Sequence, residues 1–214
     1  MTEEQFSSTH PPLPPTTEED RFAWLRLLRS RRVGVMTFWR LMAEHGSAEA
    51  ALDALPGIAR EAGLDDYQPA GRDLARAERD RAGKAGARAL AFGAPDYPAL
   101  LAEIPDPPPL LWAMGDTTLL AREAVAVVGA RNASSLGLRM ARGLAADLSA
   151  QGYVIVSGLA RGIDTSAHMA ALDGGTVAVM AGGRRRDVPG REHEARRRDR
   201  ANRAAAVGTG DGHG

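Results

Sequence analysis

The residues with the clearest chemical potential lie in a short loop, Gly129-Ala130-Arg131-Asn132-Ala133-Ser134. Gly129 permits a tight turn directly after the apolar run 124–128. Ser134 is placed to cap a following helix, whose first backbone N–H groups carry partial positive charge. Arg131 adds a fork of hydrogen-bond donors beside those groups. The loop therefore has the parts of a phosphate cradle.

This loop differs from two common phosphate-binding motifs. A dinucleotide fingerprint needs a second glycine two residues after Gly129, where this sequence has Arg131, and the Gly-Lys-Ser/Thr of a P-loop does not occur. We therefore expect a mononucleotide or a nucleic-acid backbone as the ligand rather than a nicotinamide cofactor. The alternative is that Gly129 only turns the chain and that Arg131 is solvated.

A second loop, residues 157–164, has a similar composition. Gly158 and Gly162 let backbone approach a ligand closely, and Ser157 offers a hydroxyl. Asp164 stands at an expected helix start, where a carboxylate is favourable as a cap or loop organiser without any reaction. His168 follows one turn later, so the two side chains form either a hydrogen bond on the helix surface or a catalytic pair. The candidate phosphate-binding residues are Gly129, Ala130, Arg131, Ser134, Ser157, Gly158, Arg161 and Gly162, with Asp164 as loop organiser.

The elements around these loops predict a Rossmann-like α/β core over residues 88–183. Continuous apolar strands at 124–128, 153–157 and 176–181 alternate with helices at 134–150 and 163–172. Such strands form a parallel sheet with helices on both faces. Because right-handed crossovers place consecutive strands side by side, both loops should emerge together at the carboxyl edge, where ligands bind.

The residues before this core predict a small all-helical domain. Residues 1–15 are proline-rich and are expected to form a disordered arm, and Thr16 and Glu19 have capping-box spacing. A helical domain should cover 16–66, with helices including 47–54 and 58–63, and a linking helix should lie within 67–87. Its turns Val33-Gly34-Val35 and Leu55-Pro56-Gly57-Ile58 are either helix-hairpin-helix hairpins facing a DNA phosphate or ordinary turns between packed helices.

Composition narrows the function classes only slightly. The sequence has 27 basic and 27 acidic residues, so net charge does not point to nucleic acid. Without cysteine it has no disulfide or thiolate metal site, and no signal sequence or membrane span is evident, so we expect a cytoplasmic protein. No nucleophile-base-orienter set emerges, and we predict no catalytic residue, metal or cofactor.

Three segments together resemble the DNA-processing protein A (DprA/Smf) family over about residues 20–183. They are Tyr97-Pro98 to Gly115, Val127-Val128-Gly129-Ala130-Arg131 with Ser134 and Gly137, and Val156 to Asp164 continuing through His168 to Leu172. The resemblance implies a sterile-alpha-motif-like or helix-hairpin-helix-like N-terminal domain and a recombination mediator rather than an enzyme. It implies binding and protection of single-stranded DNA in natural transformation, loading of RecA, and a homodimer. Arg131 would contact the DNA backbone, with Ser157, Gly158 and Gly162 lining the same pocket.

The resemblance is expected to stop after Gly183. Residues 184–214 are arginine-rich and contain Val188 and Val207 as their only large aliphatic residues, which predicts a disordered tail. One interpretation is a basic tail that holds DNA electrostatically. The other is a frameshift or truncation that leaves the fold incomplete. In that case the third strand would have an exposed edge and the chain would have no function. The alternative function is a Rossmann-like nucleotide hydrolase similar to the phosphoribohydrolases. Gly174-Gly175-Thr176 resembles the glycine-rich loop of those enzymes only weakly.

Overall fold

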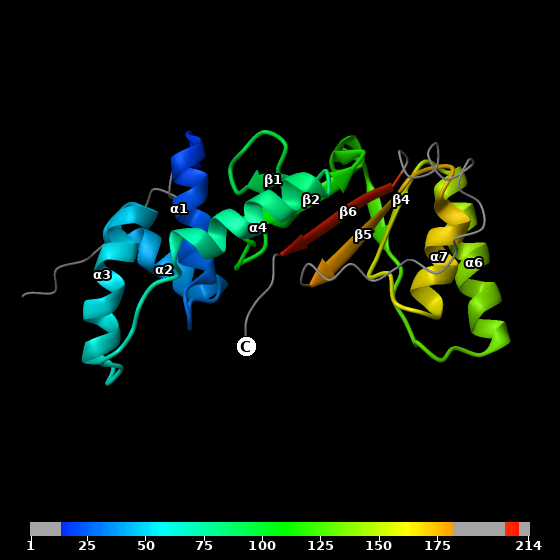
Figure 1. Cartoon of the computed structure of the whole chain (residues 1–214). Coiled ribbons are helices and arrows are strands. Elements are labelled where there is room, and N and C mark those ends of the chain that lie inside the picture. Colours follow the sequence, from blue (N-terminus) through cyan, green and yellow to red (C-terminus); the bar gives the residue numbers. More distant parts are fainter. Residues whose placement is uncertain (1–13, 182–203, 210–214) are drawn as a thin grey trace, which may run out of the picture.

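The computed structural model describes residues 14–181 and the backbone of residues 204–209. Most of the expected arm at 1–15 and of the expected tail therefore lies outside the described residues. A helical module and a pair of helices lie at opposite ends of the molecule, with a sheet between them (Figure 1). Within the described residues no helix is long and apolar enough to cross a membrane.

Three helices form the N-terminal module, and a fourth joins it to the sheet. Their bounds are α1 Glu18–Arg29, α2 Val35–His45, α3 Ala48–Glu61 and α4 Arg72–Lys84. The predicted capping box exists one residue later than expected: Thr17 accepts a hydrogen bond from the Asp20 N–H, and the Asp20 carboxylate accepts one from the Thr17 N–H. Asp20 replaces the expected Glu19 because it stands three residues after the N-cap Thr17, and its carboxylate also accepts hydrogen bonds from Thr16.

The prediction of a break between helices at 47–54 and 58–63 is wrong. Helix α3 runs through Pro56 without interruption, so the Leu55–Ile58 segment is not a hairpin. Leu55 and Ala59 are both buried, one helical turn apart, on the side that packs against α1 and α2. This apolar stripe keeps the helix continuous although proline removes one backbone hydrogen bond.

The module has its own aromatic core, which also reaches the sheet. Trp24 packs edge-on against Phe38 with 5.1 Å between ring centroids, and Trp39 packs against Phe92, just after β1, at 4.9 Å. The Trp39 indole N–H donates to the carbonyl of Pro107 at 2.8 Å. Aromatic packing and this hydrogen bond therefore join the helical module to the loops around the first strands.

A buried ion pair fixes the linking helix. Arg29 of α1 forms two hydrogen bonds of 2.7 Å with the carboxylate of Glu78 in α4. The Trp112 indole N–H, from β2, donates to the same carboxylate at 2.7 Å. One carboxylate thus ties two helices to the sheet.

The sheet has six strands in the order β1-β2-β6-β5-β4-β3. The strands are β1 Arg88–Ala91, β2 Leu110–Gly115, β3 Ala124–Ala126, β4 Val154–Ser157, β5 Thr176–Ala181 and β6 Ala204–Thr209. The strands β3 to β6 are parallel, as expected for a Rossmann-like core, whereas β1 and β2 add an antiparallel edge. The sheet is therefore mixed rather than wholly parallel.

The two faces of the sheet are covered differently. The crossover helices α6 (Ser135–Ala150) and α7 (Ile163–Ala171) pack side by side over Ile155, because both crossovers step in the same direction along the sheet. The opposite face, with Val154 and Val177, is covered by the short helix α5 (Ala99–Ala102) and the 3₁₀ helix η1 (Thr117–Ala121). Helices lie on both faces, but the long ones share one face.

Strand β6 corrects the expectation that the whole of 184–214 is disordered. Residues 204–209 form a strand that pairs in parallel with β5 and antiparallel with β2. The third strand of the parallel series, β5, therefore has no exposed edge. Sequence reasoning counted large side chains, whereas a strand between two neighbours is held by backbone hydrogen bonds on both sides, which any residue except proline can make.

Candidate phosphate-binding site

The first loop leaves the sheet at the carboxyl end of β3. The N–H of Val127 still donates to the carbonyl of Val156 at 2.9 Å, and the chain then turns at Gly129. Ser134 caps α6 as predicted, its hydroxyl accepting the N–H of Gly137 at 3.2 Å. A Cβ on Gly129 would lie 2.7 Å from a side-chain carbon of Ile163, so only glycine lets the second loop approach here.

The second loop is organised by an internal carboxylate. Asp164 is buried, and its Oδ2 accepts the N–H of Gly158 at 3.1 Å, which joins the two ends of the loop. Thr165 closes the same turn by donating through both its N–H and its hydroxyl to the carbonyl of Ala160. Leu159 has a φ of +55°, a left-handed conformation that is uncommon outside glycine. The loop is thus tightly constrained.

The two loops interlock, as their positions on adjacent strands predicted. Gly162 has a φ of +93°, and a Cβ on it would lie 2.7 Å from the carbonyl oxygen of Arg131 and closer still to that of Ala130. The N–H of Ile163, at the start of α7, donates to the carbonyl of Ala130 at 3.3 Å. The starts of α6 and α7 therefore lie at one edge of the sheet.

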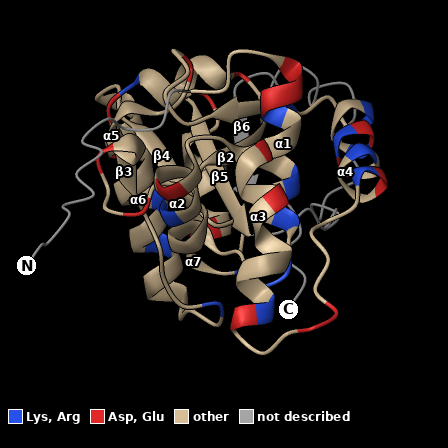
Figure 2. Ribbon diagram, turned by 90° about the vertical axis from the view of Figure 1, so that its left-hand side faces the viewer, with Lys and Arg blue, Asp and Glu red and all other residues tan. Residues whose placement is uncertain are grey.

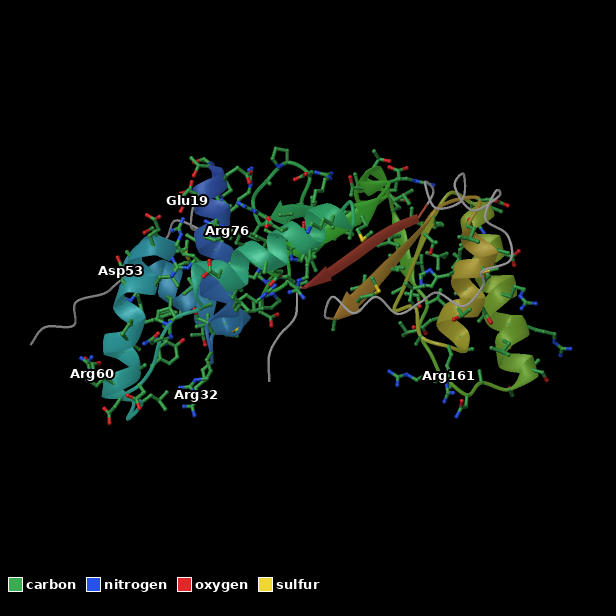
Figure 3. All side chains as sticks on the ribbon, viewed as in Figure 1. Glu19, Arg32, Asp53, Arg60, Arg76 and Arg161 are labelled. Carbon is green, nitrogen blue, oxygen red and sulfur yellow. The ribbon has the colours of Figure 1, made fainter. Side chains whose placement is uncertain are left out.

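Most of the predicted site residues are accessible there. The residues exposed to solvent are Gly129, Ala130, Arg131, Ser134, Gly158 and Arg161, and Gly162 is half-buried between the loops. Arg161 projects away from the body of the protein beyond the end of α7 (Figure 3). Two guanidinium groups beside two helix N-termini produce a positive potential at this edge.

Ser157 differs from its predicted role. It is only 3% exposed, and its hydroxyl donates to the carbonyl of Val127 at 2.6 Å. The hydroxyl therefore ties the end of β4 to β3 and is not presented to a ligand. A buried hydroxyl at the last position of a strand needs a hydrogen-bond partner, and here the nearest partner is a backbone carbonyl rather than solvent or a ligand.

Asp164 and His168 do not form the predicted hydrogen-bonded pair. The His168 Nδ1 is 2.7 Å from the hydroxyl of Thr176, which in turn donates to the carbonyl of Ile155. Because that hydroxyl gives its proton to Ile155, it accepts from His168, which fixes the proton on Nδ1. Burial lowers the pKa of His168, and the nearby Asp164 carboxylate partly opposes that change.

Sequence reasoning missed the carbonyl of Ala130 as the group that joins the two loops, and the hydroxyl of Thr176 as the partner of His168. A backbone carbonyl is present in every residue and so gives no signal in the sequence, and Thr176 lies on a strand that showed no polar pattern.

The helical module has one of the two predicted turns, since Gly34 starts α2 while the second turn is absent. Arg32 and Arg60 both lie at the lower end of this module (Figure 3).

Among the described residues, no group of three or more His, Asp, Glu or Cys side chains could hold a metal ion. Basic and acidic residues alternate along α4 (Figure 2), so that helix has no single sign of charge. The paired loops differ from it because they combine exposed arginines with backbone N–H groups. Such groups can bind phosphate without a cation.

Two family models match the chain. One, described as DNA recombination-mediator protein A, matches residues 88–207, and one described as DprA-like N-terminal HHH domain matches residues 18–80. The first match extends beyond residue 183, where the sequence resemblance was expected to stop, and includes most of β6.

Individual relatives agree with these matches. DNA processing protein DprA of Bacillus subtilis is 40% identical over 101 residues, covering 46% of this chain and 34% of that protein. Putative DNA processing protein DprA of Mycobacterium tuberculosis is 51% identical over 80 residues, covering 36% and 21%. The X-ray structure of DNA processing protein A from Streptococcus pneumoniae matches with a TM-score of 0.57 and 27% identity, covering 89% of this chain and 66% of that one. The chain thus matches about a third or less of each of these curated relatives.

Proposed function

The chain belongs to the DNA recombination-mediator protein A family, and from this premise we propose that it binds single-stranded DNA through its paired loops. The observation that carries the proposal is the interlock of Gly162 with Ala130 and Arg131. It brings two helix starts and two exposed arginines to one edge of the sheet. A single loop with one solvated arginine would not provide such a site.

The geometry suits a nucleic-acid backbone. Phosphate oxygens would accept hydrogen bonds from the first N–H groups of α6, which have no carbonyl partner in their own helix. At the start of α7, the N–H groups of Ile163 and Thr165 already donate to the carbonyls of Ala130 and Ala160. Arg131 and Arg161 would add charge-assisted, bidentate contacts to neighbouring phosphates. The buried Asp164 would hold the second loop in place without touching DNA, because its carboxylate is occupied by Gly158. Backbone contacts of this kind bind without sequence preference.

The wider role follows from the family. We propose a recombination mediator that protects incoming single-stranded DNA in natural transformation and loads RecA onto it. The names of the relatives support a part in DNA processing. The test is a nuclease-protection assay followed by RecA filament formation on the same oligonucleotide, and a chain that neither protects DNA nor accelerates filament growth would disprove this wider role.

The binding proposal is tested by fluorescence anisotropy of a labelled oligo-dT across a salt series. We expect Arg131→Ala and Arg161→Ala each to weaken binding about tenfold, as loss of a charge-assisted contact predicts. Each should also reduce the salt dependence, by about 0.7 in the log–log slope for one single-strand phosphate contact.

Arg76→Ala is the matched control, because Arg76 is exposed on α4, in the linking part of the molecule (Figure 3). It removes the same charge at a distance from the loops. If all three variants lose affinity equally, binding depends on net charge and the paired loops are not the site. The nucleotide-hydrolase alternative rests on Gly174-Gly175-Thr176, which stands at the amino end of β5 and so lies at the opposite edge of the sheet from the paired loops.

A further inference from the structure

Two exposed valines lie beside the paired loops, on the face of the sheet opposite α6 and α7. Val128 is 74% exposed and directly precedes Gly129, and Val179 in β5 is 50% exposed. Successive side chains of a strand point to opposite faces. Val127 packs with Ile155 on the helix-covered face, so Val128 is directed to the other one. The two helices lie together on one side of the sheet (Figure 1), which leaves the opposite side free of them.

The register of the sheet places these valines in one row. The pairing of β4 with β3 and β5, continued past the end of β4, aligns Val128, Gly158 and Val179. A Cβ added to Gly158 would lie 3.8 Å from the carbonyl oxygen of Val179, which agrees with this alignment. Because Gly158 has no side chain, the row is a shallow apolar surface with an open centre. We call these three residues the valine floor.

The valine floor is the uncovered end of a face that is otherwise packed. Towards the amino ends of the strands, Val154 and Val177 are buried beneath α5 and η1. At the carboxyl end, the exposed fractions of Val128 and Val179 show that no described element shields them fully. Leu159 of the second loop adds an apolar side chain that is 38% exposed. Exposed apolar side chains gathered at one place mark a contact surface.

We propose that the valine floor binds the flat faces of unpaired bases, which rests on the proposed binding of single-stranded DNA and assigns the residues that contact its bases. The floor is continuous with the paired loops, because Val128 adjoins Gly129 and Gly158 begins the second loop. Phosphates bound at the start of α6 lie on the helix side of the carboxyl edge, so bases that extend across this edge meet the opposite face. The floor carries no charged side chain and therefore complements bases rather than phosphates. Such contacts tolerate any sequence, because every base has a face.

The valine floor gives a physical reason for a preference for single strands. In a duplex the base faces are stacked on one another, and exposing one of them costs unstacking and unpairing energy. In a single strand the bases can turn towards the floor without breaking pairs. Arg131 and Arg161 would contact phosphates in both kinds of DNA. The valines rather than the arginines should therefore set the difference in affinity between a single strand and a duplex.

Fluorescence anisotropy of the full chain with three labelled probes separates base contacts from phosphate contacts. The probes are an oligo-dT, a strand of equal length made of abasic sites, and a duplex of that length. Val128→Thr and Val179→Thr keep the side-chain shape and the preference for extended backbone, while a hydroxyl replaces a methyl group. We expect each variant to weaken oligo-dT binding about threefold and the double variant about tenfold. Affinity for the abasic strand and for the duplex should stay unchanged.

A gain of affinity provides a result that misfolding cannot imitate. Val179→Tyr places an aromatic ring on the valine floor, in a strand position that accommodates tyrosine well. Stacking on this ring should tighten oligo-dT binding about fivefold and leave the abasic strand unaffected. Leu144→Thr is the matched control, because Leu144 is 55% exposed on α6, on the helix side of the sheet. It should leave the binding of all three probes unchanged.

Arg131→Ala separates failure of the valine floor from failure of the paired loops, because it should weaken the binding of all three probes alike. If it does so while the threonine and tyrosine variants leave oligo-dT binding unchanged, the loops bind DNA and the valine floor does not bind bases. Threonine variants that lower the melting temperature without altering DNA affinity would show that the protein itself covers the floor, which also overturns the proposal. Absence of binding to every probe overturns both proposals.

Discussion

Gly162 packs directly against the backbone of Ala130, with a φ of +93° and no space for a Cβ between the two residues. Gly162→Ala should therefore separate the loops. The left-handed strain alone costs about 1–3 kcal/mol, and the clash with the carbonyl oxygen adds to it. Urea unfolding should show the loss of stability, and oligo-dT anisotropy should show weaker binding.

Gly57→Ala is the control for this substitution. Gly57 lies inside α3 with no atom within 4 Å of an added Cβ, and alanine is the better helix former. This variant should gain up to about 1 kcal/mol of stability and bind DNA normally. Equal behaviour of the two glycine variants would mean that the loops do not interlock as described.

The second prediction concerns Asp164, whose carboxylate accepts the N–H of Gly158 at 3.1 Å. Asp164→Ala leaves that N–H without its partner and should lower the free energy of unfolding by about 2 kcal/mol. Asp164→Asn keeps an acceptor oxygen and should lose less. Hydrogen exchange at Gly158 checks this directly, because protection should fall in the alanine variant and largely persist in the asparagine variant.

The third prediction concerns pH and His168. Because burial lowers the pKa of His168 below its ordinary value of 6.5, the unfolded chain binds the proton more readily than the folded one. The contribution of His168 to stability is therefore complete above about pH 6.5 and falls as the pH drops further. Melting temperatures measured from pH 8 to pH 5 should show this decline.

His168→Gln removes the titrating group and should flatten this part of the pH profile. The variant should start less stable at pH 8, because the hydrogen bond to Thr176 is disturbed. A profile as steep as that of the unaltered chain would assign the acid sensitivity to other groups.

The fourth prediction concerns the ion pair between Arg29 and Glu78, whose side chains are each 10% exposed. Glu78→Ala leaves a buried guanidinium and the Trp112 N–H unpaired, and should cost about 3–5 kcal/mol of unfolding free energy. The exposed pair formed by Arg40 and Glu44 provides the comparison, since Glu44→Ala should cost no more than about 0.5 kcal/mol. Similar losses in chemical denaturation would show that the buried pair has no special role.

The sequence predicted the parallel core and the meeting of its two loops because apolar strands and glycine positions carry strong local signals. The Ser134 cap could be predicted for the same reason. The continuation of α3 through Pro56 could not be predicted, because burial of Leu55 and Ala59 in the tertiary structure outweighs the local tendency of proline to end a helix. The hydrogen-bond partner of the Ser157 hydroxyl also lies outside its own strand, at Val127, so the local sequence around Ser157 does not predict it.

Strand β6 has a consequence for how the protein is made. It lies between β2 and β5, although both of those strands precede it in the sequence. On the ribosome the first hairpin and the β3–β5 unit emerge earlier, and they become one continuous sheet only after residue 204 has been synthesised. Until then β2 and β5 each present unpaired backbone, which attracts strands of other chains. Slow translation of the segment between β5 and β6 therefore prolongs the period in which nascent chains are prone to aggregate.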